Sequence, residues 1–417
     1  MELSTFGRRF SAQAGILTLM DDLGAALATG NQIMLGGGNP AYIPAIQQRC
    51  RERMQQLLAD GNAFERLIGD YCSPAGPRRF RQAVAELLRR EYGWPLTADN
   101  IALTNGSQSA FFYLFNSFAG RYDNGRMKKI LLPLAPEYIG YADVGIDGEI
   151  FTSNRPRIEF PGNGRFKYHV DFDQLKIDTD IGAICVSRPT NPTGNVLTDN
   201  EINRLSQLAA AHHIPLIIDN AYGTPFPNII FTAATPIWNE NIVLSLSLSK
   251  FGLPGTRCGI VVAREEIIRV MGGMNAIFNL SPTALGAALA EEMMRSGEII
   301  ELSRREIRPF YQAKAERACQ TLAHLLRGTD CFIHVPEGAI FLWLWMRDLP
   351  ISAAELYRRL KERRVVVVPG HYFFPGLPAG WRHCQECIRI TFAPDDQTVA
   401  AGLRIIAEEV INAYREG

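Results

Sequence analysis

The sequence predicts an α/β fold, in which a large domain with a mostly parallel sheet between helices is joined to a smaller α/β domain. The chain has 417 residues, which is too long for one small core. Near-continuous apolar runs bounded by turn residues are typical of parallel strands buried on both faces. These runs cover residues 129–132, 181–187, 216–220, 242–248 and 259–263. Between two of them lies a helical segment, residues 199–213, which begins with a capping-box pattern.

The first hundred residues alternate between turns and helical patterns. A triple glycine, Gly36–Gly38, precedes a helical pattern over residues 46–58, and it lacks the spacing of a dinucleotide-binding fingerprint. A turn at residues 71–77 leads into a helix over 78–91. A short strand at 100–106 then ends on glycine and is followed directly by a helix. This arrangement points free backbone N–H groups at an anion, although a capped core helix would give the same pattern.

The carboxyl-terminal part predicts a second, smaller α/β unit. Residues 282–326 form a long helical connection. After it we expect strands at 340–346, 365–368 and 388–392 with helices at 353–363 and 399–414. We therefore assign residues 61–310 to the large domain and 311–417 to the small domain, to which residues 1–60 also contribute.

Composition excludes several function classes. The 43 basic and 43 acidic side chains cancel, so a nucleic-acid partner is not expected. No apolar run reaches membrane-spanning length, and charged residues interrupt the first 35 residues, unlike a signal peptide. We therefore expect a cytoplasmic protein whose eight cysteines are free thiols. The motif His383-Cys384-Gln-Glu-Cys387 has no second Cys-x-x-Cys, which favours two thiols in a loop over zinc, and no metal is expected.

A lysine at the end of a buried strand is the strongest chemical signal in the chain. Residues 242–248 lead to Lys250, and Arg257 follows after a Gly/Pro turn. Desolvation penalises a buried ammonium unless the group is paired or used. An amine with a lowered pKa condenses with an aldehyde to form a Schiff base, as in enzymes of pyridoxal 5′-phosphate. The alternative is that Lys250 has a structural role and is buried as an ion pair with a carboxylate.

Other polar residues fall at the ends of predicted strands and should meet at the carboxyl edge of the sheet. Asp219 could keep a pyridine nitrogen protonated, while Asn191 and Tyr222 could donate to the ring hydroxyl. A phosphate needs helix N–H groups and a fixed cation, which the run Gly106, Ser107 and Gln108 and the side chain of Arg257 could supply. Each residue taken alone could equally be structural.

The order of these motifs resembles the fold-type I aminotransferases that use pyridoxal phosphate. The sequence runs Gly106-Ser-Gln, Tyr138, Asn191-Pro-Thr-Gly, Asp219-x-x-Tyr222, Ser247-x-Ser-Lys250, Arg257 and Arg389. Segments 104–115, 133–141 and 337–345 are similar to the bacterial valine–pyruvate aminotransferase subfamily, and the similarity extends nearly end to end. The resemblance implies transfer of an amino group between valine, or a similar aliphatic amino acid, and pyruvate, giving 3-methyl-2-oxobutanoate and alanine.

The resemblance also implies roles for further residues. Tyr138 matches the aromatic residue that stacks on the cofactor ring, and Ser247 and Ser249 match the hydroxyl positions before the lysine. Arg389 matches the arginine that binds the substrate carboxylate, together with Asn191 and the Gly38 loop. Tyr71 matches a tyrosine that reaches the partner's phosphate, which requires a homodimer.

Two other functions use similar residues. β-Lyases and cyclopropane-forming synthases share the same cofactor site, and release of pyruvate and ammonia from one amino acid would identify a lyase. Cofactor-sensing modules of transcription regulators carry an additional winged-helix domain and a basic linker, for which the sequence gives no signal.

Overall fold

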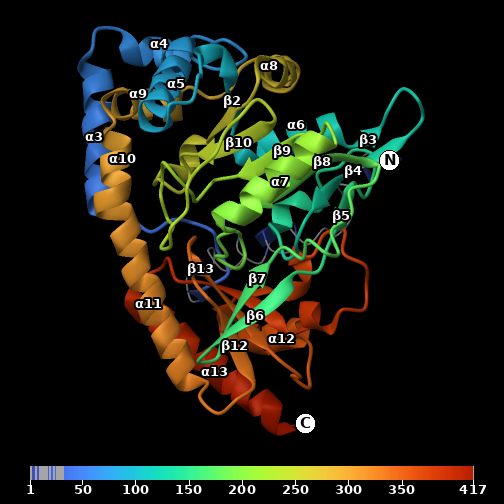
Figure 1. Cartoon of the computed structure of the whole chain (residues 1–417). Coiled ribbons are helices and arrows are strands. Elements are labelled where there is room, and N and C mark those ends of the chain that lie inside the picture. Colours follow the sequence, from blue (N-terminus) through green and yellow to red (C-terminus); the bar gives the residue numbers. More distant parts are fainter. Residues whose placement is uncertain are drawn as a thin grey trace.

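The computed structural model describes residues 2–4, 7–8, 17, 20–21, 24 and 32–416. Two α/β lobes lie one above the other, and the long helix α11 (Arg308–Leu325) runs along one side from the upper lobe to the lower (Figure 1). Most of the polar opening that argued against a signal peptide lies outside the described residues.

Within the described residues, the large lobe contains an eight-stranded sheet in the order β2-β11-β10-β9-β8-β4-β3, with β5 also paired to β4. Its strands are β2 (Ile101–Asn105), β3 (Gly120–Arg121), β4 (Met127–Leu132), β5 (Phe151–Ser153), β8 (Ile181–Ser187), β9 (Leu216–Asp219), β10 (Ile242–Ser247) and β11 (Cys258–Val262). Pairings from β10 through β9, β8 and β4 to β5 are parallel, whereas β11 and β3 pair antiparallel with their neighbours. The predicted strands and the mostly parallel sheet are confirmed.

The sheet is apolar on both faces because helices cover both. Its helices are α3 (Pro44–Ala59), α4 (Ala63–Gly69), α5 (Arg78–Tyr92), α6 (Ser107–Phe118), α7 (Asp199–Ala211), α8 (Glu265–Asn279) and α9 (Leu285–Ser296). Alternate strand residues enter two separate clusters: Ala183 and Cys185 pack with residues of α6 and α8, whereas Ile184 and Val186 pack with the cluster that includes α5 and α7. Burial on both faces explains the near-continuous apolar runs.

In the part of the chain that the structure describes, the small lobe contains a six-stranded sheet in the order β15-β16-β13-β12-β7-β6. Its strands are β6 (Arg157–Gly162), β7 (Arg165–His169), β12 (Cys331–His334), β13 (Phe341–Met346), β15 (Val368–Pro369) and β16 (Cys387–Thr391), and its helices are α12 (Ala353–Glu362) and α13 (Asp396–Glu416). The β6–β7 hairpin was not predicted; it comes from the middle of the chain and joins this sheet through β12. The domain boundaries at residues 60 and 310 stay predictions.

Two connections between the lobes position the site. The amino-terminal strand β1 (Ile33–Met34) pairs in parallel with β14 (Val365–Val366), which brings the following glycine loop to the small lobe. The predicted connection after residue 282 is α9, then α10 (Glu298–Leu302), a π-helical turn (Ser303–Ile307) and α11. The predicted strand at 365–368 divides, because β14 pairs with β1 whereas β15 pairs with β16.

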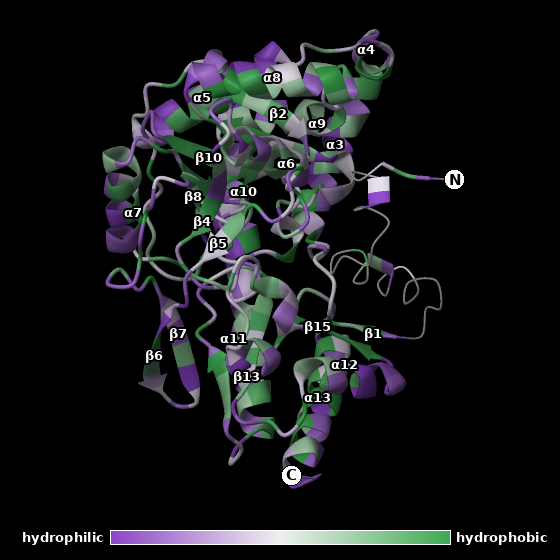
Figure 2. Ribbon diagram, turned by 90° about the vertical axis from the view of Figure 1, so that its right-hand side faces the viewer, coloured by the Kyte–Doolittle hydropathy of each residue, from purple (hydrophilic) through white to green (hydrophobic). Residues whose placement is uncertain are grey.

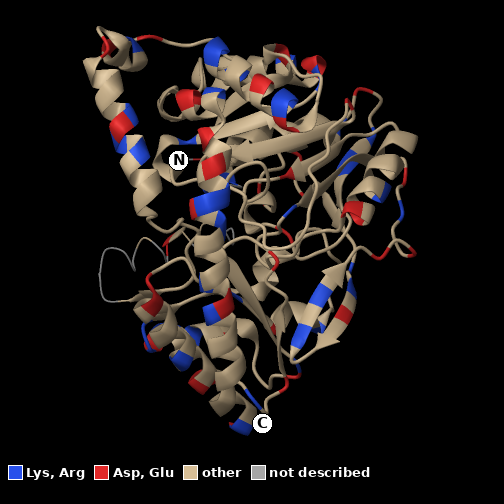
Figure 3. Ribbon diagram, turned by 60° about the vertical axis from the view of Figure 1, so that its left-hand side comes forward, with Lys and Arg blue, Asp and Glu red and all other residues tan. Residues whose placement is uncertain are grey.

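Apolar residues concentrate on the inner strands such as β4 and β8, and peripheral helices such as α7 and α12 carry polar residues (Figure 2). Acidic and basic residues are interspersed along the surface helices in the view of Figure 3. Among the described residues, no helix combines the length and apolar character needed to cross a bilayer.

Candidate active site

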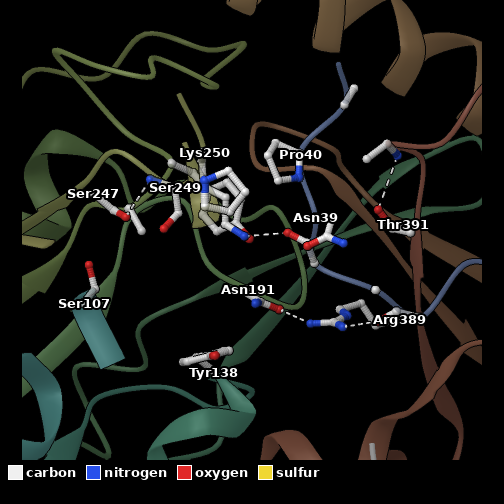
Figure 4. Close-up of a pocket in the computed structure, with 18 of the residues that line it drawn as sticks. Asn39, Pro40, Ser107, Tyr138, Asn191, Ser247, Ser249, Lys250, Arg389 and Thr391 are labelled. Carbon is white, nitrogen blue, oxygen red and sulfur yellow. Dashed lines mark hydrogen bonds between the residues drawn. The ribbon is translucent and has the colours of Figure 1, made fainter. Parts of the chain in front are cut away.

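A cavity of about 810 Å³ lies at the carboxyl ends of the parallel strands. It is lined by every site residue predicted from the sequence except Gly106 and Tyr71. Ser107, Tyr138, Asn191 and Lys250 border the same space from different elements (Figure 4). The topology explains this convergence, because β8, β9 and β10 are parallel and the segments after them meet at one edge of the sheet.

Lys250 lies three residues after β10, and its Nζ donates a hydrogen bond to the Gly38 carbonyl oxygen at 2.6 Å. The ammonium is 5.2 Å from the centre of the Tyr222 ring. Burial, followed by the positive charges of Arg389 and Arg257, lowers the pKa of Lys250 to about 8, although Asp219 acts in the opposite direction. A substantial fraction of this amine is therefore neutral near physiological pH.

Asp219 is the last residue of β9 and is buried at the cavity wall. Its Oδ2 accepts a hydrogen bond from the Tyr141 hydroxyl at 2.7 Å, and its Oδ1 accepts from the Ala221 N–H at 3.0 Å. Burial raises the pKa of the carboxyl, and these two donors partly offset that effect. An adjoining cation would complete the pairing of this carboxylate.

The amino terminus of α6 lies against the side chain of Arg257. Gly106 has φ +84°, which favours glycine, and a Cβ at this position would overlap the Arg257 guanidinium. The absence of a side chain therefore allows the cation to lie against the start of the helix. Ser107 and Gln108 open the helix, where backbone N–H groups have no intrahelical partner. Charge and geometry both suit a phosphate.

Arg389, on β16, is buried between the lobes. Its Nη1 donates to Asn191 Oδ1 and its Nη2 donates to the Gly36 carbonyl, each at 2.7 Å (Figure 4). The guanidinium carbon lies 4.2 Å from the centre of the Phe341 ring and 5.2 Å from that of Phe373. Burial lowers the pKa of Arg389 to about 10, so the side chain remains charged at neutral pH.

The remaining predicted residues occupy different surroundings. Ser249 N–H donates to Ser247 Oγ at 3.1 Å, so the two serines before Lys250 form one turn at the cavity edge. Tyr138 lies on the opposite side of the cavity from Lys250 (Figure 4). Tyr71 is 79% exposed and lies outside the cavity of its own chain.

Sequence reasoning missed several residues of the site. Tyr141 contacts Asp219, and Phe310 and Lys314 at the start of α11 line the cavity. Tyr141 lies within the segment 133–141 that carried the resemblance, but its partner depends on how the turn after β4 folds back onto β9. Phe310 and Lys314 gave no signal, because they read as part of a surface helix.

The His383–Cys387 segment belongs to the small lobe. Cys387 Sγ lies 3.6 Å from His383 Nε2, and His383 also contacts the Tyr168 hydroxyl. In the part of the chain that the structure describes, no group of three or more His, Cys, Asp or Glu side chains is arranged to hold a metal ion.

Comparison with known proteins gives a family for this arrangement. Residues 31–406 match the family described as aminotransferase class I and II. The chain belongs to the class I and II aminotransferases. It is also 51% identical over 416 residues, covering 100% of both chains, to the valine–pyruvate aminotransferase of Escherichia coli K12.

Solved structures agree with the family. A putative amino-acid aminotransferase from Psychrobacter arcticum 273-4 has a TM-score of 0.97 with 47% identity, covering 100% of both chains. Valine–pyruvate aminotransferase from Salmonella typhimurium LT2 has a TM-score of 0.89 with 50% identity, covering 97% of this chain and 100% of that one. The predicted family, the fold-type I architecture and the aminotransferase activity are confirmed.

Members of this aminotransferase family depend on pyridoxal 5′-phosphate, and the cofactor prediction is confirmed. The residues of the cavity fit such a group. A helix amino terminus with an adjacent arginine suits the phosphate, a buried carboxylate suits a protonated ring nitrogen, and an amine with a lowered pKa suits the aldehyde. The substrates of the enzyme are amino acids and 2-oxo acids.

Proposed function

We propose that this aminotransferase moves an amino group between valine, or a similar aliphatic amino acid, and pyruvate. The full-length 51% identity to a valine–pyruvate aminotransferase carries the proposal. The cavity supports it, since Met34, Ile139 and Phe310 supply apolar lining for an aliphatic side chain. A pocket discriminates one methylene by only about 1–3 kcal/mol, so we expect related aliphatic amino acids to be accepted as well.

We assign the cofactor contacts as follows. The start of α6 at Ser107 and Gln108, with Arg257, holds the phosphate, and Asp219 holds the ring nitrogen. Tyr138 stacks on the ring, and the ring hydroxyl receives hydrogen bonds from the side chains of Asn191 and Tyr222. Gly106 lets Arg257 approach, and Ser247 and Ser249 support the turn that carries Lys250.

Lys250 is proposed to attach the cofactor and to move the proton of the reaction. When bound, pyridoxal phosphate withdraws electrons from the substrate α-carbon and so makes its proton acidic. Because burial and nearby cations lower the pKa of Lys250 to about 8, part of the free Nζ is neutral and can accept that proton, which it gives back later in the reaction. Asp219 keeps the ring nitrogen protonated through its negative charge.

Arg389 is proposed to bind the substrate carboxylate. Its guanidinium is already oriented by Asn191 and the Gly36 carbonyl, and a planar fork suits a carboxylate. The Gly38 loop closes the cavity next to this arginine and contributes a backbone N–H. With the carboxylate on Arg389, the proton of the substrate α-carbon faces the Lys250 side of the cavity.

Product analysis tests the substrate proposal. Purified enzyme loaded with cofactor is incubated with pyruvate and each member of an amino-acid panel, and 2-oxo acids and alanine are quantified. We expect 3-methyl-2-oxobutanoate and alanine in equal amounts from valine, and little product from aspartate. Activity highest with aspartate would refute the substrate assignment, whereas pyruvate and ammonia formed from one amino acid without an acceptor would indicate a β-lyase.

We also propose a homodimer in which Tyr71 reaches the partner's phosphate. Large side chains exposed on the large lobe support an interface: Tyr42, Ile68, Tyr71, Ile277, Phe278 and Leu280. Mixing Tyr71→Ala with Lys250→Ala chains tests the shared site, because a mixed dimer has one site with both native residues. We expect activity to return after subunit exchange; a mixture as inactive as its parents contradicts the arrangement.

We place the enzyme in the cytoplasm. All eight cysteines are free in the described structure, which supports a reducing compartment. Fractionation of the source cells with antibody detection tests this location, and recovery of the protein outside the cytoplasmic fraction would contradict it.

A further inference from the structure

A second buried carboxyl group, that of Glu137, lies behind the Asp219 wall of the cavity. Its side chain is 1% exposed. Its Oε1 accepts a hydrogen bond from Ser187 N–H at 2.9 Å, and its Oε2 accepts from Tyr138 N–H at 3.3 Å. Ser187 Oγ lies 2.5 Å from the same Oε2. Within the described residues Glu137 has no ion-pair partner, so the carboxyl is held by neutral groups.

Glu137 is connected to Asp219 through two hydroxyl groups. Ser187 ends β8 and lies directly beside Asp219 in the parallel register of β8 and β9. Ser187 Oγ is 3.4 Å from the Tyr141 hydroxyl oxygen, and that hydroxyl donates to Asp219 at 2.7 Å. The contacts therefore run in sequence from Glu137 through Ser187 and Tyr141 to Asp219.

The number of available protons determines which group donates in each hydrogen bond between Glu137 and Asp219. Each hydroxyl carries one proton. If both carboxyls were ionised, Ser187 would donate to Glu137 and Tyr141 to Asp219, which would leave two oxygens facing each other without a proton between them. If Glu137 keeps its proton, it donates to Ser187, Ser187 donates to Tyr141 and Tyr141 donates to Asp219, so every contact contains one proton.

The surroundings favour the protonated form of Glu137. Among the residues that the structure describes, the titratable groups that face it are Asp219, Tyr138, Tyr141 and Cys185. Burial above all, and then the charge of Asp219, raises the pKa of Glu137 to about 8, against the effect of its hydrogen bonds. Asp219 is by contrast close to the positive charge of Lys250, so the negative charge of the pair belongs on Asp219.

We propose that Glu137 is a positioning residue that stays protonated and directs the hydrogen-bond chain through Ser187 and Tyr141 to Asp219. The chain stabilises Asp219 as the anion and fixes its orientation toward the cavity. This inference rests on the proposed role of Asp219 at the cofactor ring nitrogen.

Infrared spectroscopy of the cofactor-free protein tests the protonation directly. The difference spectrum of wild type minus Glu137→Gln at pH 7 should contain the carbonyl stretch of a protonated carboxylic acid, which disappears as the pH is raised well above 8. A difference spectrum with only carboxylate bands at pH 7 would overturn the proposal. This measurement does not depend on the role of Asp219.

Cofactor binding tests the connection to Asp219. Glu137→Gln retains a neutral donor toward Ser187, so we expect pyridoxal phosphate affinity and the pH midpoint of the bound cofactor's visible absorbance to stay near wild type. Ser187→Ala and Glu137→Ala interrupt the chain, so we expect affinity to fall about 3- to 10-fold and the pH midpoint to shift. Equal effects of Glu137→Gln and Glu137→Ala, or an unchanged midpoint in Ser187→Ala, would overturn the proposal.

Two further variants distinguish a failure of the role proposed for Glu137 from a failure of the role proposed for Asp219. Glu201→Gln alters another buried carboxyl, which caps α7 outside the cavity, so it should change stability without moving the absorbance midpoint. Asp219→Asn tests the proposed function itself. If Asp219→Asn weakens cofactor binding while Ser187→Ala does not, only the role of Glu137 fails; if Asp219→Asn has no effect, the assignment of Asp219 fails.

Discussion

The pKa of Lys250 is lowered because its amine is buried and lies close to other positive charges. Burial is the largest cause, and the charges of Arg389 and Arg257 add to it. Since the neutral amine attacks the aldehyde, the rate of cofactor loading should rise with pH to a midpoint near 8, well below the ordinary 10.5 of lysine. Stopped-flow absorbance of cofactor-free protein mixed with pyridoxal phosphate measures this midpoint.

The Arg389→Gln variant provides the control for the loading midpoint. It removes one of the charges that lower the pKa of Lys250, so its midpoint should move upward. A wild-type midpoint near that of an ordinary lysine would contradict the electrostatic account.

Even the conservative replacement of Arg389 by lysine should weaken substrate binding. The side chain uses two guanidinium nitrogens to contact Asn191 and Gly36 and lies flat near Phe341, and a lysine ammonium cannot reproduce this geometry. We expect Arg389→Lys to raise the KM for the amino acid about 10- to 100-fold, with a smaller change in kcat. Steady-state kinetics with valine measures both, and an unchanged KM would contradict the assignment of the carboxylate site.

Residues that form part of a recognisable sequence motif could be predicted, whereas residues whose role depends on contacts with other elements could not. Asp219 ends a recognisable strand, Lys250 follows one and Arg389 lies within one, and the structure brings them to one cavity. Tyr141 and Glu137 could not be assigned, because their contacts depend on the register of β8 against β9 and on the turn after β4.

At the element scale, the strand–turn–helix of β2 and α6 supplies a testable position. Gly106→Ala should displace Arg257 and weaken cofactor binding by at least about 10-fold, because the added methyl overlaps the guanidinium. Gly125→Ala is the matched control: it has φ +76° but opens onto empty space, so it adds backbone strain without touching the site. Calorimetric titration with pyridoxal phosphate compares them, and equal losses would contradict the steric argument.

Strands that are buried on both faces could be predicted from the sequence, whereas a mostly exposed strand could not. β8, β9 and β10 are fully buried and read as apolar runs. The β6 strand is mostly exposed and carries Arg157 and Glu159, so its sequence gave no periodic signal. It joins the small-lobe sheet only through its hairpin partner β7, which pairs with the distant strand β12, and a local pattern cannot predict that pairing.

At the scale of the whole molecule, two buried histidines in the small lobe should make the fold acid-sensitive. Burial lowers the pKa of both His334 and His383 to about 3. Between that value and the ordinary 6.5, the unfolded state binds more protons, so stability falls as the pH drops. Each histidine should lower the free energy of unfolding by about 2 kcal/mol at pH 5 relative to pH 7, and this loss should be visible as a lower thermal midpoint.

Two variants check the source of this acid sensitivity. His383→Gln cannot take up a proton and should reduce the loss between pH 7 and pH 5. His212→Gln alters an exposed histidine and should leave the loss unchanged. A thermal midpoint that is the same at both pH values in the wild type would show that the buried histidines do not control acid stability.

The account of the enzyme depends on a covalent bond between Lys250 and its cofactor, and one measurement tests that bond directly. Protein loaded with pyridoxal phosphate is reduced with borohydride, digested and mapped by mass spectrometry. We predict a single phosphopyridoxyl group on the peptide that contains Lys250, and none after prior incubation with excess valine, which removes the cofactor from the lysine. A label on a different lysine, or no label at all, would contradict the account.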